Sequence, residues 1–298
     1  MIPILDWSRF SRGSDRVGFV REFGAACRES GFFLLSGHGI DQPLIQSVFE
    51  QADRFFELTE AEKRTLSVPS IAQERGWSKI GTESLEEGSD RPDRKEAFGI
   101  GPEAPGDTPA VRWGAPYRGA NLWPDIPGFR ETMLRFFSAA QVLAMSLHRA
   151  VAADLDLPEG WYDNRVKDPD ARLRLLHYPP ASGARGEMGA GTHTDPGVLT
   201  LLLTDGEPGL QVRPTPDGPW IDVPHNPGSF VVNVGDSLME WSGGRYISSP
   251  HRVVPPQHVR RSVAFFLRPE PTRSRGSAVE TRSGQAWADS ALQSYARA

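Results

Sequence analysis

The feature that most constrains the fold is a change of pattern near residue 170. From there on, short apolar runs rich in Leu, Val and Phe follow one another, separated by turn signals such as Asp205-Gly206, Asp217-Gly218 and Gly243-Gly244. These runs predict strands over residues 172–178, 199–203, 210–212, 220–223, 230–234, 238–241 and 263–267. Many short strands with regular turns favour a jelly roll or a barrel over a parallel α/β sheet.

The part of the chain before residue 170 predicts helices that cover this core. The longest helix, over residues 129–155, carries an apolar stripe at helical spacing and ends before Leu157-Pro158. The other elements predicted here are helices over 16–30, from the N-cap Asp41 and from the capping box Thr59-x-x-Glu62, and strands over 2–5 and 32–35. We interpret His38, which lies between two glycines, as a turn histidine hydrogen-bonded to the backbone.

We therefore expect a mainly β protein with flanking helices, in which a jelly-roll core is backed by N-terminal and central α-helices. A chain of 298 residues can bury a sizeable core as one large domain or two small ones, and we interpret this one as a single compact domain. Its expected parts are an N-terminal region of helices, strands and pocket-shaping loops (1–123), a backing helix (124–158), the jelly-roll core (170–268) and a C-terminal tail with a short helix (269–298).

Three residues of the strand-rich half form a candidate metal site. His193 and Asp195 are two positions apart, and residues i and i+2 of a strand point to the same face. His251 is the third candidate, on a distant strand that the fold brings alongside. Two imidazoles and one carboxylate, with the remaining positions open, are the ligand set of non-haem Fe(II) oxygenases.

A candidate carboxylate anchor follows nine residues after His251. Arg260 and Ser262 repeat the i, i+2 spacing, and a guanidinium beside a hydroxyl suits a carboxylate. A metal triad followed by such an anchor is what a 2-oxoglutarate-dependent oxygenase needs, because the keto acid chelates iron at one end and its far carboxylate must be held. His-x-Asp alone is a weak signal, and the alternative is a barrel with a satisfied core histidine, a loop aspartate and surface arginines. The combination in this order favours the iron site.

Further motifs extend this pattern along the chain. They are Ser36-Gly37-His38-Gly39-Ile40, Leu176-His177-Tyr178-Pro179-Pro180, Gly209-Leu210-Gln211-Val212, Asn233-Val234-Gly235-Asp236, Gly244-Arg245-Tyr246, His251-Arg252-Val253 and Arg260-Arg261-Ser262. From Pro3 to about Arg268 the chain resembles the isopenicillin N synthase-like family of Fe(II)/2-oxoglutarate oxygenases. It departs from many plant members at Leu176, where they have Asn, and at Thr204, where they have Gln.

The resemblance implies a double-stranded β-helix with iron on His193, Asp195 and His251, and a keto acid held by Arg260, Ser262 and Tyr178. It implies a dioxygenase that uses Fe(II), 2-oxoglutarate and O2 to oxidise, most simply to hydroxylate, a C–H bond of a small molecule, releasing succinate and CO2. The carboxylate of Asp195 argues against halogenation. The alternatives are a keto-acid-free oxidase or cyclase of the isopenicillin N synthase type and a catalytically silent protein that binds iron or a keto acid. A zinc hydrolase is disfavoured because the chain lacks His-Glu-x-x-His.

The stretch from residue 68 to 123 loses regular periodicity, and the resemblance places it over the open side of the barrel. The candidate substrate contacts in it are Arg75, Trp77, Arg94, Lys95 and Phe98. For each of them, a solvated loop with ordinary surface charges is an equally good interpretation. The three cations among them favour a substrate that bears a carboxylate.

Composition excludes some partners. The net charge of −5 and a pI near 5.8 argue against binding to nucleic acid or to an anionic membrane. Cys27 is the single cysteine, so no intrachain disulfide forms, and the sequence has neither a signal-peptide pattern nor a run of eighteen apolar residues. We expect a cytoplasmic protein. The tail after Pro271, with a predicted helix over 285–295, is a candidate for covering the site or for oligomer contacts, and a frayed terminus is the alternative.

Overall fold

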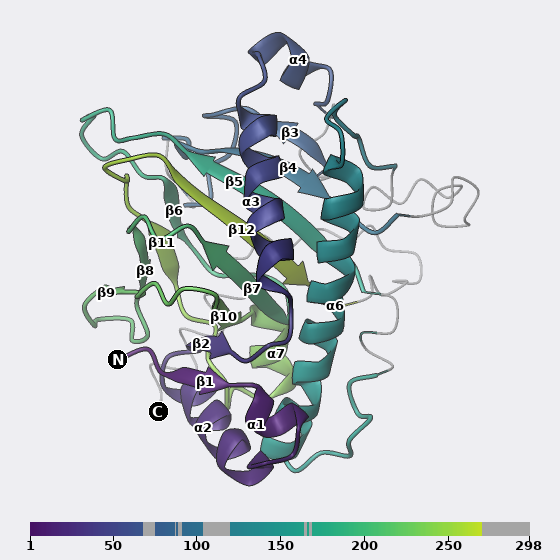
Figure 1. Ribbon diagram of the computed structural model, residues 1–298. Coiled ribbons are helices and arrows are strands. Elements are labelled where there is room, and N and C mark those ends of the chain that lie inside the picture. Colours follow the sequence, from purple (N-terminus) through teal and green to yellow (C-terminus); the bar gives the residue numbers. More distant parts are fainter. Residues whose placement is uncertain are drawn as a thin grey trace, which may run out of the picture.

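The computed structural model describes residues 1–67, 75–86, 88, 91–103, 120–163, 166 and 169–269, and is dominated by two β-sheets (Figure 1). The described strands are β1 (Ile4–Asp6), β2 (Phe32–Ser36), β3 (Gly76–Ser78), β4 (Glu96–Ile100), β5 (Arg172–Tyr178), β6 (Ala190–His193), β7 (Leu199–Thr204), β8 (Leu210–Val212), β9 (Ile221–Asp222), β10 (Phe230–Val234), β11 (His251–Val253) and β12 (Arg260–Leu267). One sheet has eight strands in the order β1-β2-β10-β7-β12-β5-β4-β3, and the other has four in the order β6-β11-β8-β9. Every pairing is antiparallel except that of β1 with β2.

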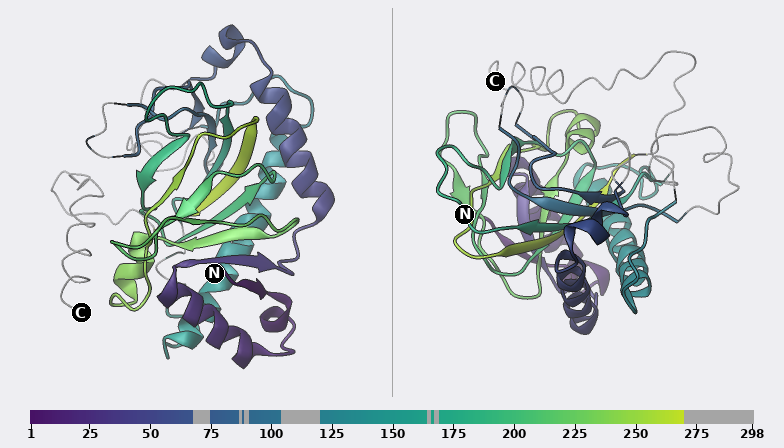
Figure 2. Two further views of the ribbon diagram at one scale, coloured as in Figure 1. Left: turned by 90° about the vertical axis from the view of Figure 1, so that its left-hand side faces the viewer. Right: turned by 90° about the horizontal axis from the view of Figure 1, so that it is seen from above.

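Helices cover one face of the eight-stranded sheet. The described helices are α1 (Ser8–Ser11), α2 (Arg16–Glu29), α3 (Gln42–Phe56), α4 (Glu60–Arg64), α6 (Phe129–Asp154) and α7 (Asp236–Trp241). Figures 1 and 2 show α3 and α6 side by side along this face, with the four-stranded sheet away from them. Among these helices, none is long and apolar enough to cross a membrane. The expectation of a mainly β protein with flanking helices is confirmed.

Strand alternation sorts the side chains of β12 between two environments. Val263, Phe265 and Leu267 are buried in the cluster that includes the apolar stripe of α6. The Phe265 ring meets the Phe137 ring edge-on, with their centroids 5.3 Å apart. Each fully buried side chain of this size contributes about 1.5–3 kcal/mol to the stability of the fold. Packing against the apolar stripe of α6 therefore determines which face of the sheet is covered by the helices. The opposite face, with Ser262, is left for a site.

Several local predictions are confirmed. The helix expected over 129–155 is α6, and the capping box forms at α4, where the Glu62 amide donates to Thr59 Oγ1 (3.3 Å) and the Thr59 amide donates to Glu62 Oε2 (2.8 Å). Asp41 holds the N-cap position of α3 without a side-chain cap bond. His38 is a backbone-bonded turn histidine, with Nε2 2.8 Å from the Gly228 carbonyl oxygen and Nδ1 accepting from the Ile40 amide at 3.1 Å.

One predicted strand is wrong. Residues 238–241 lie in the helix α7, which begins after Gly235 at the end of β10. Asp236 in the first turn favours the helix N-terminus. Leu238 is buried and Trp241, three positions on, packs partly buried against the same core, which is helical spacing. A run this short carries too few residues to separate the two periods.

The region from 68 to 123 contains two strands that the sequence did not predict. All five residues of β4 are buried between β3 and β5, although one of them is Glu96. Its carboxylate accepts hydrogen bonds from the Lys63 ammonium (2.9 Å) and the Trp77 indole (2.8 Å), and lies 3.2 Å from the His177 ring. The buried charge breaks the apolar pattern that a strand prediction relies on. The predicted helix over 285–295 and the rest of the tail lie outside the described residues.

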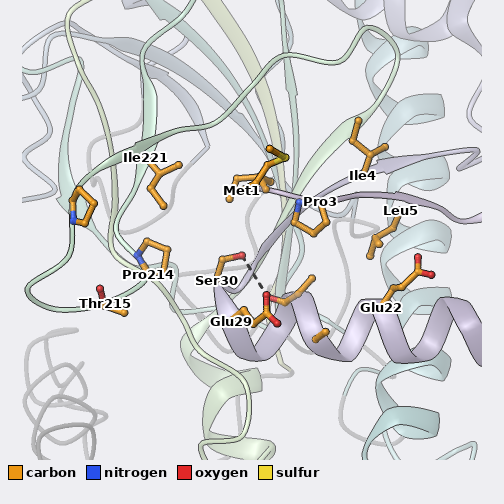
Figure 3. A pocket seen from close by; sticks show the side chains of 14 residues that line it. Met1, Pro3, Ile4, Leu5, Glu22, Glu29, Ser30, Pro214, Thr215 and Ile221 are labelled. Atoms are coloured by element: carbon orange, nitrogen blue, oxygen red, sulfur yellow. Dashed lines mark hydrogen bonds between the residues drawn. The ribbon is translucent and has the colours of Figure 1, made fainter.

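A cavity of about 600 Å³ lies where β1, α2 and the loop after β8 meet (Figure 3). Its lining is largely apolar and includes Pro3, Ile4, Pro214 and Ile221, with Glu29 of α2. It shares no lining residue with the cavity that contains the candidate metal site. The metal site therefore has a chamber of its own.

Candidate metal centre

The three predicted metal ligands are brought together. The strands β6 and β11 pair so that His193 and His251 are direct partners, with ring centroids 4.3 Å apart. Asp195 lies two residues beyond the end of β6, and its Oδ1 is 3.9 Å from His193 Nε2 and 3.7 Å from His251 Nε2. One ligand atom from each residue lies within 4.8 Å of the others, and no other such trio exists in the described part of the chain.

Backbone carbonyls orient both imidazoles. His193 Nδ1 lies 2.8 Å from the Gly191 carbonyl oxygen, and His251 Nδ1 lies 3.1 Å from the Ser249 carbonyl oxygen. A carbonyl only accepts, so each Nδ1 carries a proton, and in the neutral ring each Nε2 then keeps its lone pair. Both lone pairs belong to the nitrogens that lie near the Asp195 carboxylate. This second contact on the far ring nitrogen is typical of metal-binding histidines.

Two hydrogen bonds hold the carboxylate of Asp195. Its Oδ2 accepts from Thr200 Oγ1 at 2.6 Å and from Asn233 Nδ2 at 2.7 Å. Thr200 and Asn233 are cross-strand partners on β7 and β10, so both donors reach the same oxygen. The backbone is fixed as well, because the Asp236 amide donates to the Asp195 carbonyl oxygen at 2.8 Å. Only Oδ1 is left to face the histidines.

The electrostatics of the trio suit a cation. Burial, helped by the neighbouring His251, lowers the pKa of His193 to about 3, so the ring is neutral at pH 7. Burial alone would raise the pKa of Asp195, but the two histidines and the bonds from Asn233 and Thr200 lower it on balance. Neutral imidazoles and an ionised carboxylate are the forms that bind a metal.

The predicted carboxylate anchor lies on β12 and its neighbour β5. Arg260 pairs with Tyr178, and the guanidinium carbon lies 4.9 Å from the centre of the Tyr178 ring. Ser262 Oγ lies 3.4 Å from Arg260 Nη1. Arg260 is 1% exposed, and its Nε has no hydrogen-bond partner among the described residues. A buried guanidinium with an unused donor fits an anionic ligand.

Anchor and trio line one cavity of about 570 Å³. His193, Asp195 and His251 come from the four-stranded sheet and the turn after it, whereas Arg260 and Ser262 come from the eight-stranded sheet. The cavity is also lined by Tyr178, Leu176, Arg174, Phe32, Leu202 and Phe266. The site thus lies between the two sheets.

The structure does not bring the five predicted substrate contacts to one place. Lys95 lines the cavity, but the other four residues do not. Phe98 packs in the core against the Phe55 ring at 4.4 Å, and the Trp77 indole donates to Glu96. Arg75 is 2% exposed and donates to the Asn121 side chain and the Pro102 carbonyl oxygen. Arg94 pairs with Glu187, with Nε 2.7 Å from Oε1.

Sequence reasoning missed Thr200, Asn233 and Arg174 as site residues. Asn233 belongs to the motif Asn233-Val234-Gly235-Asp236, to which the sequence alone assigns no role. Its partner depends on strand register, which a single sequence does not specify. Arg174 lines the cavity because it shares a strand face with Leu176 and Tyr178, and the alternation over 172–178 was the available signal.

Two family profiles match the chain. Residues 2–126 match the N-terminal region of the non-haem dioxygenase in morphine synthesis, and residues 169–269 match the 2OG-Fe(II) oxygenase superfamily. The second match spans the trio and the anchor.

Curated relatives and solved structures agree with these profiles. The 2-oxoglutarate-Fe(II) type oxidoreductase hxnY of Emericella nidulans is 36% identical over 279 residues, covering 90% of this chain and 80% of the relative. The 2-oxoglutarate-dependent dioxygenase citB of Monascus ruber is 39% identical over 260 residues, covering 83% and 78%. The crystal structure of a full-length Neurospora crassa protein in complex with alpha-KG has a TM-score of 0.79 and 32% identity, covering 90% of this chain and 85% of that one.

Proposed function

The chain belongs to the 2-oxoglutarate-Fe(II) oxygenase superfamily, within its isopenicillin N synthase-like branch, and from this premise we propose which residues hold the metal, the keto acid and the substrate. It is a non-haem dioxygenase that requires Fe(II), 2-oxoglutarate and O2, with the jelly-roll fold of that family. The reaction class predicted from the motifs is thereby confirmed, and turnover is the measurement that separates it from the keto-acid-free oxidase and the silent binding protein.

His193 Nε2, Asp195 Oδ1 and His251 Nε2 are the proposed iron ligands. The proposal is supported by their mutual approach within 4.8 Å, by the carbonyls that fix both imidazoles and by the two donors that occupy Asp195 Oδ2. When bound with 2-oxoglutarate and O2, the iron supplies the oxidant for a substrate C–H bond, and the keto acid leaves as succinate and CO2. The chain itself contributes three fixed ligand atoms on one face and leaves the cavity side open.

Arg260, Ser262 and Tyr178 are the proposed anchor for the far carboxylate of 2-oxoglutarate. The main observation in support of this anchor is the buried guanidinium of Arg260, which lines the cavity of the trio and whose Nε donor has no partner among the described residues. A desolvated guanidinium–carboxylate pair in this place both binds the keto acid and sets its orientation toward the metal. Ser262 adds a hydroxyl donor beside it.

The substrate is a small molecule. Further complexes of the Neurospora crassa protein contain thymine or 5-formyluracil with alpha-KG, and the JOX2 structure, with a TM-score of 0.77 and 28% identity, contains JA. For this chain, the proposed substrate is a molecule that fits beside the keto acid in a cavity of about 570 Å³ and becomes hydroxylated.

We also propose a cytoplasmic location, because one cysteine in 298 residues is usual in a reducing compartment. The organisation as one domain is supported by β1 to β4, which complete the large sheet.

The test is an anaerobic titration of the Fe(II) protein with 2-oxoglutarate, followed by the visible charge-transfer band of the chelate. We expect the band in the wild type. In Arg260→Ala the apparent Kd for 2-oxoglutarate should rise by about 30-fold or more, since a buried charge pair is broken, while iron binding is retained. Arg261→Ala is the matched control, because Arg261 pairs with Asp53 and Asp205 outside the cavity. An unchanged Kd in Arg260→Ala would remove Arg260 from the anchor.

A further inference from the structure

We propose that Lys95 anchors the primary substrate by a hydrogen bond to an uncharged oxygen, so that the enzyme selects neutral carbonyl-bearing small molecules over carboxylates. This inference rests on the proposed function, because it concerns the same cavity. It replaces the carboxylate-bearing substrate expected from the cations of the sequence.

Lys95 occupies a place that no other described lysine shares. It directly precedes β4, which pairs with β5, and it lines the cavity of the trio together with Arg174 and Tyr178 of β5. Its side chain is 3% exposed. A buried ammonium needs partners for its charge and for its three N–H donors.

Two carboxylates contact this ammonium, one by a hydrogen bond and one as an ion pair. Lys95 Nζ contacts Asp93 Oδ2 and lies 3.4 Å from Glu83 Oε2. The second oxygen of Asp93 accepts from the Gly191 amide at 2.8 Å, and the second oxygen of Glu83 lies 2.5 Å from Arg174 Nη2. Both carboxylates are therefore fixed from the far side, and the ammonium is fixed by them. The ammonium has three donors, so it keeps donor capacity for a group inside the cavity that Lys95 lines.

The charges at this end of the cavity cancel. Lys95 and Arg174 contribute two positive charges, and Asp93 and Glu83 contribute two negative ones. Burial alone would raise the pKa of Glu83, but Arg174 and Lys95 hold it at about 2, so it is ionised. A substrate carboxylate placed here would bring an uncompensated buried charge, whereas a carbonyl oxygen accepts the same hydrogen bond without that cost.

The remaining surroundings fit a neutral molecule. Phe32, Leu85, Leu202 and Phe266 add apolar lining to the cavity, which suits a ring or chain next to the polar end. Of the two other arginines that line the cavity near its walls, Arg268 lies 4.0 Å from Asp170, whereas Arg213 lies over the Trp220 ring at 4.9 Å and its Nε has no hydrogen-bond partner among the described residues.

The experiment compares matched probe pairs on the anaerobic Fe(II)–2-oxoglutarate protein. The pairs are thymine with uracil-5-carboxylate and indole-3-acetamide with indole-3-acetate, and the measurement is the change that each probe causes in the charge-transfer band. We expect the neutral member of at least one pair to bind about tenfold or more tightly than its carboxylate partner. A carboxylate member that binds at least as tightly as its neutral partner in every pair that responds, or no response to any neutral member, overturns the inference. Absence of the 2-oxoglutarate band itself would instead reject the proposed function.

Two variants separate recognition from a merely structural role. Glu83→Gln keeps an acceptor but removes one negative charge, so the ratio of the carboxylate Kd to the neutral Kd should fall by about tenfold. Lys95→Met should abolish the response to the neutral probe while the band with 2-oxoglutarate persists. Lys63→Met is the matched control, because Lys63 is also buried and paired but does not line the cavity. Unchanged ratios in Glu83→Gln contradict the inference even if Lys95→Met does not fold.

Discussion

At the residue scale, two hydrogen bonds decide which oxygen of Asp195 faces the histidines. Thr200 and Asn233 both donate to Oδ2, at 2.6 Å and 2.7 Å. If either donor is lost, Oδ2 keeps a single hydrogen bond and the carboxylate is held less firmly in the orientation that turns Oδ1 towards the histidines. Its proposed role as a ligand therefore depends on two residues, Thr200 and Asn233, that are not among the proposed ligands.

We predict that Thr200→Val weakens Fe(II) binding by about 10- to 100-fold, the usual effect of removing a hydrogen-bond partner from a metal ligand. Equilibrium titration of the apoprotein with Fe(II) under anaerobic conditions measures it. Thr204→Val is the control, because Thr204 lies on the same strand but contacts His225 at 3.0 Å. Equal Fe(II) affinity in Thr200→Val and the wild type would show that Asn233 alone suffices.

The residues of the trio and of the anchor were predictable from their spacing, although only Arg260 and Ser262 share a strand, whereas Asp195 lies in the turn after β6. His193 and Asp195 stand two apart, as do Arg260 and Ser262. The contacts of Thr200 and Asn233 were not predictable, since they depend on the register between β7 and β10. Lys95 is singled out by its charge, but only the fold shows that two carboxylates already neutralise its end of the cavity.

At the scale of elements, the long helix α6 packs its apolar stripe against the large sheet. Leu147 is fully buried on its apolar stripe, whereas Val142 of the same helix is 66% exposed. Substitutions at these two positions of one helix can therefore compare the effect of a buried side chain on stability with that of an exposed one. Its contacts lie on the face of the sheet that points away from the metal site.

We predict that Leu147→Ala lowers the free energy of unfolding by about 2–5 kcal/mol through the cavity that it leaves. Val142→Ala should change it by no more than about 0.5 kcal/mol, because the side chain is exposed and alanine favours helix. Chemical denaturation followed by circular dichroism measures both. A loss in Leu147→Ala as small as that in Val142→Ala would contradict the role assigned to the stripe.

Long elements were predictable and short ones were not. The stripe of α6 repeats over 26 residues, so its period is unambiguous. In contrast, α7 has six residues and its sequence reads equally well as a strand, and β3 and β4 escape prediction because Gly76, Glu96 and Gly99 interrupt them. Tertiary contacts contribute to the two strands, which pair with each other and with β5 and include Glu96, the partner of Lys63.

At the scale of the whole molecule, stability depends on pH through a histidine far from the metal site. His148 of α6 is 3% exposed and packs beside the Tyr162 ring at 5.3 Å. Burial lowers its pKa from 6.5 to about 4. Between these values the unfolded chain binds a proton that the folded chain does not, so stability falls as the pH decreases from 6.5 towards 4.

The pKa difference corresponds to about 3 kcal/mol over this window. We predict that His148→Leu reduces the slope of the unfolding free energy against pH between 7 and 4.5, leaving the part that comes from the buried His193, and that His225→Gln, at an exposed histidine, leaves the slope as in the wild type. Urea denaturation at a series of pH values measures the slopes. Parallel slopes in His148→Leu and the wild type would contradict the prediction.

The position of β12 in the sheet differs from that of the strand next to Lys95 in how easily it opens locally. It pairs with β5 from Arg260 to Phe266 and with β7 from Ser262 to Leu267, so both of its edges are closed. Lys95 instead precedes β4, whose outer neighbour β3 has three residues and ends the sheet. Local opening requires the least free energy at such a border and the most at a doubly paired strand. The proposed substrate contact therefore lies at the border of the sheet that opens most readily, whereas the proposed keto-acid anchor lies on the doubly paired strand at its centre.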